Sequence, residues 1–79
     1  MATNETVRNL VEMVINKKRV QLGKLTGMEQ AKMHKLINWI HEGGYWIEVS
    51  DMWWMARTYN GYRIRYQPDI GELVAEKVR

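Results

Sequence analysis

Basic side chains are the clearest chemical signal in this sequence. Between residues 14 and 35 the chain holds six Lys or Arg residues and one acid, Glu29, so this stretch carries a net charge of +5 where the whole chain carries +3. Cations held together can neutralise several phosphates of a nucleic acid and release their counterions. The six are Lys17, Lys18, Arg19, Lys24, Lys32 and Lys35. A solvated helix end followed by a polar loop gives the same pattern, and this alternative stays open.

A second basic group lies between residues 52 and 67, which contain three arginines and no acid. Guanidinium groups match the geometry of phosphates, and Trp54 nearby offers a flat surface for a base or a sugar. The predicted nucleic-acid-binding residues are Lys17, Lys18, Arg19, Lys24, Trp54, Arg57, Arg63 and Arg65. This prediction requires that Arg63 and Arg65 are not held in carboxylate pairs. An ordinary solvent-facing strand, with Trp54 covered by residues 45–49, is an equal alternative.

The aromatic residues are unusual in kind, with four Trp, four Tyr and no Phe beside six Met. Trp and Tyr suit half-buried positions and interfaces because each ring carries a polar group, and Met is common at adaptable binding surfaces. We expect a mostly buried group of rings formed by Trp39, Trp46, Trp53, Tyr59, Tyr62 and Tyr66. The total still exceeds what a thin core requires. The predicted protein interface is formed by Met28, Met52, Trp53 and Trp54. Its partner is a target protein or, in a homodimer, a second copy of the chain.

No group of residues indicates catalysis. The chain has no Cys, a single Ser at position 50, and none of the phosphate-loop, nucleophile-elbow or zinc-protease motifs. His34 and His41 are seven residues apart, about two helical turns, which is too far for one metal ion. We therefore expect no enzymatic activity, no catalytic residues, no metal and no cofactor.

Two helices are expected in the first half of the chain. The first spans about residues 4–19, and its apolar stripe is formed by Val7, Leu10, Val11 and Val14. The second begins at a capping box, in which the Thr26 hydroxyl and the Glu29 carboxylate each bind a free backbone N–H. It ends at Gly43-Gly44, because glycine adopts the left-handed conformation at little cost.

The second half of the chain predicts strands. Residues 45–49 are rich in β-forming residues, and Asn60-Gly61 separates two further runs of this kind. Asn-Gly favours a two-residue hairpin turn, because both central residues of that turn need positive φ. The predicted cross-strand pairs are Tyr59 with Tyr62, Arg57 with Ile64, and Met55 with Tyr66. Their face packs on the helices, and the face with Arg63 and Arg65 looks outward.

Two further helices are considered in this half of the chain. Residues 52–58 also have helical spacing after Ser50-Asp51, so a short helix there is the alternative to the first strand of the hairpin. After Pro68, Asp69 is expected to cap a short C-terminal helix. The apolar side of that helix is formed by Ile70, Leu73, Val74 and Val78.

Together these elements predict one small α+β domain over residues 1–79. An antiparallel helix pair packs on a small antiparallel β-hairpin or three-stranded meander, and a short C-terminal helix closes the fold. This element order is similar to that of winged-helix and excisionase-like DNA-binding proteins, although no motif supports the resemblance. The core is thin, because a chain of this length buries only about 60% of its unfolded surface.

The functional expectation is a small accessory protein of a phage or a bacterium that binds nucleic acid, DNA or RNA. The alternative is a modulator or inhibitor of a host enzyme, which acts through protein–protein contacts of the Trp- and Met-rich surface. No stretch approaches the roughly 20 apolar residues of a membrane span. The first residues resemble no signal peptide, so we expect a cytoplasmic location.

Overall fold

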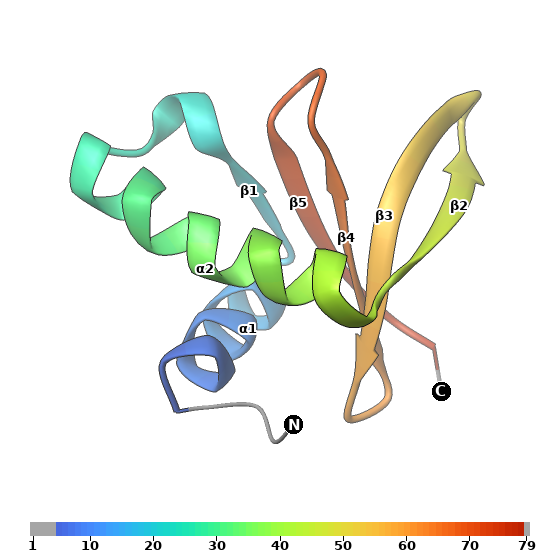
Figure 1. The fold of residues 1–79 in the computed structure, drawn as a ribbon, viewed down its shortest axis with the longest axis horizontal. Coiled ribbons are helices and arrows are strands. Elements are labelled where there is room, and N and C mark those ends of the chain that lie inside the picture. Colours follow the sequence, from blue (N-terminus) through green and yellow to red (C-terminus); the bar gives the residue numbers. More distant parts are fainter. Residues whose placement is uncertain (1–4, 79) are drawn as a thin grey trace.

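Two helices cover one face of a five-stranded antiparallel sheet in the computed structural model, which describes residues 5–78 (Figure 1). The elements are α1 (Glu5–Lys17), β1 (Arg19–Gln21), the 3₁₀ helix η1 (Leu22–Lys24), α2 (Gly27–Gly43), β2 (Tyr45–Val49), β3 (Met52–Tyr59), β4 (Tyr62–Gln67) and β5 (Glu72–Lys77). The predicted α+β class is confirmed. The described residues contain two more strands than the largest predicted sheet.

The sheet has the strand order β1-β5-β4-β3-β2. Strands β2 to β5 form a meander. Strand β1, which lies between α1 and α2 in the sequence, pairs with the other edge of β5. The hairpin at Asn60-Gly61 is confirmed with its register, since Tyr59 pairs with Tyr62 and Met55 with Tyr66. Residues 52–59 form one continuous strand, so the alternative helix over residues 52–58 is wrong.

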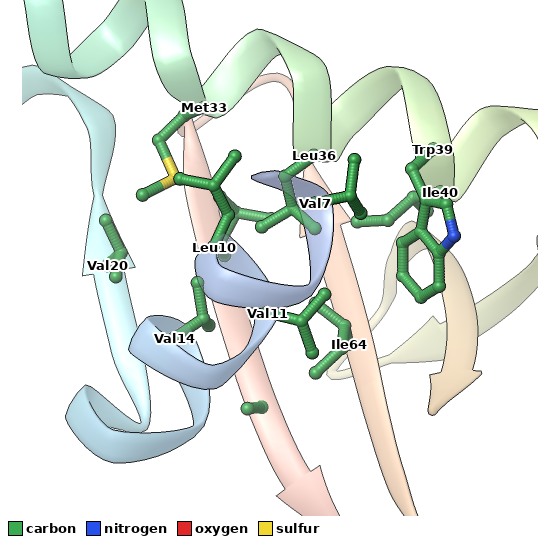
Figure 2. Packing of buried hydrophobic residues seen from close by; sticks show 12 residues of the cluster. Val7, Leu10, Val11, Val14, Val20, Met33, Leu36, Trp39, Ile40 and Ile64 are labelled. Carbon is green, nitrogen blue, oxygen red and sulfur yellow. The ribbon is translucent and has the colours of Figure 1, made fainter. Parts of the chain in front are cut away.

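The hydrophobic core lies between the helices and this sheet (Figure 2). The predicted stripe of α1 is buried, and it meets a matching stripe from α2 and residues of three strands. The core consists of Val7, Leu10, Val11, Val14, Val20, Met33, Leu36, Trp39, Ile40, Ile64, Leu73 and Ala75. Main helix–sheet contacts run from α1 to β1, β4 and β5 and from α2 to β3 and β4.

Local signals explain where α2 begins and where α1 ends. Helix α2 ends at Gly43 as predicted, but the left-handed conformation expected there is wrong, since Gly44 is extended with φ of −99°. The capping box of α2 is confirmed, with Thr26 Oγ1 accepting from the Glu29 backbone N–H at 3.2 Å and Glu29 Oε1 accepting from the Thr26 N–H at 2.9 Å. Helix α1 ends two residues earlier than predicted, because Lys18 has φ of 70° and its N–H caps the Val14 carbonyl at 2.7 Å. The predicted start near Asn4 lies outside the described residues.

The predicted short C-terminal helix is wrong. Gly71 has a φ of 59°, which breaks a right-handed helix, and residues 72–77 form β5. Leu73 and Ala75 alternate into the core, whereas the expected helical partner Ile70 is exposed. Strand β5 fills the position between β4 and β1, so tertiary pairing overrides a helix propensity that is only a fraction of a kcal/mol per residue.

The turn between β2 and β3 offers a test of how these two strands pair. Ser50 and Asp51 have φ of 54° and 63°, a conformation that favours glycine or asparagine. We expect the double substitution Ser50→Asn and Asp51→Gly to stabilise the fold by about 1 kcal/mol, because Asn-Gly adopts this turn with less strain. Thermal unfolding should then shift upward by roughly 4–8 °C. A lower unfolding temperature would show that the turn is not built this way.

Candidate functional site

The arginines of β4 lie on the sheet face without helices, and a carboxylate from β5 holds both. Glu76 Oε2 accepts a hydrogen bond from Arg63 Nε at 2.5 Å and lies 3.4 Å from Arg65 Nε. Cross-strand pairing places Arg63 directly opposite Glu76. The expectation that these guanidinium groups are free of carboxylates is therefore wrong. Glu76 lies in a segment for which the sequence pattern predicts a helix, so that pattern gives Arg63 no cross-strand carboxylate.

Trp54 is covered rather than presented to solvent. Its residue is 5% exposed, and the Arg65 guanidinium lies 4.2 Å from the centre of its ring. On the other side, Ile47 of β2 is its cross-strand partner. This matches the alternative in which residues 45–49 help to cover Trp54. A base could not stack on this ring without displacing Arg65.

Arg57 joins the end of α2 to β3. Its Nη1 donates to the Trp39 carbonyl oxygen at 2.6 Å, and its guanidinium lies 4.3 Å from the centre of the Trp39 ring. A cation at a helix C-terminus is favourable, because the carbonyl groups there carry partial negative charge. Gly43 leaves the room for this contact, since a Cβ there would lie 2.6 Å from Arg57 Cζ. Arg57 thus has a structural role whether or not it also binds phosphate.

The predicted corner cations Lys17, Lys18, Arg19 and Lys24 are all exposed. Lys17 and Lys32 both line a pocket of about 160 Å³ between α1 and α2, with Leu10 and Met33 among its apolar residues. Two cations of the basic stretch, one of them the predicted Lys17, therefore line the same pocket although 15 residues separate them in sequence. Arg19 Nε is 3.7 Å from Glu72 Oε2, and this arginine side chain remains largely exposed.

Glu29 is the acid of this corner. The pKa of Glu29 lies below its ordinary value of 4.5. The main cause is the hydrogen bond from the Thr26 backbone N–H, followed by the hydrogen bond with the Thr26 side chain. The positive charges of Lys17 and Lys32 also lower this pKa. The carboxylate is already bound at the start of α2. It therefore offsets the charge of the lysines without forming a close pair with either.

Two tryptophans are exposed although the sequence pattern placed both in the mostly buried group of rings, with Trp53 also in the predicted interface. Trp46 and Trp53 are 55% and 58% exposed. Trp46 pairs with Met55, and Trp53 lies two residues before Met55, so the two indoles occupy diagonal positions on one sheet face. It is the face that carries the helices, since Met55 packs against the core. In Figure 1 the turn between β2 and β3 extends away from the two helices.

We call residues 44–54 the β2–β3 end. Its only charged residues are Glu48 and Asp51, so its net charge is −2 in a chain of positive charge. Glu48 pairs with Trp53 and therefore shares the face of the two indoles. Tyr45, on the opposite face, is also exposed. The surface thus combines large exposed rings with acidic groups.

The structure exposes two of the four residues of the predicted protein interface. Trp53 and Met28 are exposed, Met52 is half-buried, and Trp54 is buried. Met28 lies in the first turn of α2. In Figure 1 the start of α2 and the hairpin of β2 and β3 lie on opposite sides of the molecule. Trp46, which that prediction did not include, is exposed on the same face as Trp53. The two-residue turn at Ser50-Asp51 sets this arrangement, and the sequence pattern assigned that dipeptide a role only in the alternative reading, as the cap of a short helix.

No cluster of three or more metal-ligating side chains is found in residues 5–78. Within the same range, neither helix has the length and apolar character of a membrane span. Tyr66, beside Met55 on the helix-bearing face, has a pKa raised by burial. None of these observations identifies a catalytic group.

Removal of the Glu76 carboxylate tests its pairing with Arg63 and Arg65. We expect Glu76→Gln to lower the free energy of unfolding by roughly 1–2 kcal/mol, because Arg65, with a side chain only 13% exposed, would lose its carboxylate. Chemical denaturation measures this loss. Glu12→Gln, which removes an exposed carboxylate of α1, is the control and should change stability little. Equal stability of both variants would contradict the assigned pairing.

A functional proposal for this chain has to rest on its own surfaces, because comparison with known proteins indicates none. No protein-family model, curated protein or solved structure matches this chain.

Proposed function

We propose that this protein is a binding module for another protein and that its site is the β2–β3 end. The observation that carries this proposal is the exposure of Trp46 and Trp53, each above one half, on one sheet face. Indole rings left in water retain a large unrealised gain from burial. Tryptophan is also among the residues that most often carry the binding energy of protein interfaces.

The charges of the same surface favour a protein over a nucleic acid at this site. Glu48 and Asp51 would repel phosphates, and residues 44–54 contain no Lys or Arg. The arginines of the neighbouring strands are engaged within the chain, as described for Arg57, Arg63 and Arg65. A partner therefore gains from contact with the rings and from positive charge of its own.

The double variant Trp46→Ser and Trp53→Ser tests the site. We expect it to remain folded, because both residues are more than half exposed and lie outside the core. It should bind its partner at least about 30-fold more weakly, the equivalent of one 2 kcal/mol hot spot. Affinity capture with nuclease treatment at high salt, followed by titration of the captured protein, measures the loss. Met28→Ser removes an exposed side chain elsewhere and should bind normally. Equal binding by the Trp46/Trp53 variant would rule out this site.

Nucleic-acid binding is the second candidate function, and it now depends on the basic corner alone. The observation in its favour is that Lys17 and Lys32, from different helices, line one pocket, with Lys18 and Arg19 exposed beside the end of α1. Cations fixed on two elements can hold neighbouring phosphates at lower entropic cost than cations on a mobile loop.

Salt dependence tests the second candidate. For the double variant Lys17→Ala and Lys32→Ala, we expect the plot of log affinity against log salt concentration to become less steep. The magnitude of its slope should decrease by about 2, since each lost phosphate contact removes about 0.9. Fluorescence anisotropy with labelled single- and double-stranded oligonucleotides measures the slope. Arg8→Ala with Lys77→Ala removes two exposed cations elsewhere and should leave the slope nearly unchanged. Identical slopes for the two double variants would exclude the corner as a phosphate site.

A further inference from the structure

The two edges of the sheet differ in how they are protected, and this difference bears on the partner of the β2–β3 end. Among residues 5–78, no strand pairs with the outer edge of β1 or of β2. Strand β1 has three residues and begins at Arg19, directly after Lys18. Short length and positive charge are the usual means by which an edge strand avoids pairing with other chains.

Strand β2 lacks these protections. Its five residues, Tyr-Trp-Ile-Glu-Val, include no Lys and no Pro, and four of the five favour strands. Alternate backbone N–H and C=O groups along an edge strand point away from the sheet and can bind an added strand. The edge lies beside the two exposed indoles, because Trp46 belongs to β2 itself. Edge and rings together form one continuous surface.

The side chains of β2 define what an added strand would meet on each face. On the helix-bearing face they present Trp46 and Glu48, which suit a cation through ring and carboxylate. On the opposite face they are the apolar side chains of Tyr45, Ile47 and Val49. An added strand that satisfies both faces must therefore alternate basic and apolar residues.

We infer that the partner of the β2–β3 end is an extended segment of another protein, with Lys or Arg at alternate positions and apolar residues between them, which adds to β2 as a sixth strand. This inference rests on the proposed function. Charge argues against a second copy of this chain in that place. Two β2 strands paired antiparallel about Ile47 would set Glu48 of each copy against Trp46 of the other and would bring two acidic ends together without a cation.

Synthetic peptides of nine residues test the inference. The probe alternates Lys and Val, and its controls replace Lys with Glu, replace Val with Ser, or keep the composition with all Lys before all Val. We expect the alternating Lys/Val peptide to bind at least 10-fold more tightly than each control. Shifts of the amide signals of residues 45–49 and of the Trp46 and Trp53 indole N–H signals in NMR spectra should accompany binding.

Backbone pairing is tested by N-methylation of alternate residues of the same probe. Methyl groups along one edge of the peptide should abolish binding, and methyl groups along the other edge should leave it intact, because an added strand uses only one edge. Glu48→Lys should bind the Glu/Val peptide instead of the Lys/Val peptide. Loss of binding with both methylation patterns, or with neither, would overturn strand addition.

The failure of this inference can be told apart from failure of the proposed function. If the captured partner protein requires Trp46 and Trp53 but no alternating basic peptide binds, the site stands and the proposed chemistry of its partner is wrong. If the Trp46/Trp53 variant keeps full affinity for the captured protein, the proposed function itself is wrong. A homodimer that protects the amides of β2 without peptide would also overturn the inference.

Discussion

Two helices of 13 and 17 residues bury only part of one face of a five-stranded sheet, because they do not extend over its whole width. The core therefore forms over β1, β5, β4 and the adjoining part of β3. Beyond it, the same sheet face continues into β2 and the far part of β3 without a cover. The exposure of Trp46 and Trp53 follows from this limit, because residues at core-facing positions remain in water wherever no helix lies above them.

The face without helices is closed in a different way. Arg65 covers the Trp54 ring and shares the Glu76 carboxylate with Arg63. These contacts hide apolar surface without a second layer of helices, because the stems and guanidinium groups of arginine pack well on rings. The consequence for function is direct. Cations that would serve a polyanion in an extended arrangement instead stabilise the sheet.

Charge is therefore distributed between two separate regions of the molecule. The helix corner around Lys17 and Lys32 is positive, whereas the β2–β3 end is acidic and aromatic. An extended polyanion would be attracted by the first region and repelled by the second. This separation is the physical reason why we propose a protein partner with basic residues, and not a nucleic acid, for the β2–β3 end.

The sequence by itself determined what short-range chemistry controls: the capping box at Thr26, the stripe of α1, and the hairpin at Asn60-Gly61 with its register. Each depends on residues close together in the chain, so a local pattern is sufficient. The tertiary structure alone decided that residues 72–77 form a strand, that Glu76 meets Arg63, and that no helix covers Trp46 and Trp53. Those outcomes depend on which distant segments compete for the same sheet edge and on how far the helices extend, and neither quantity is encoded in local periodicity.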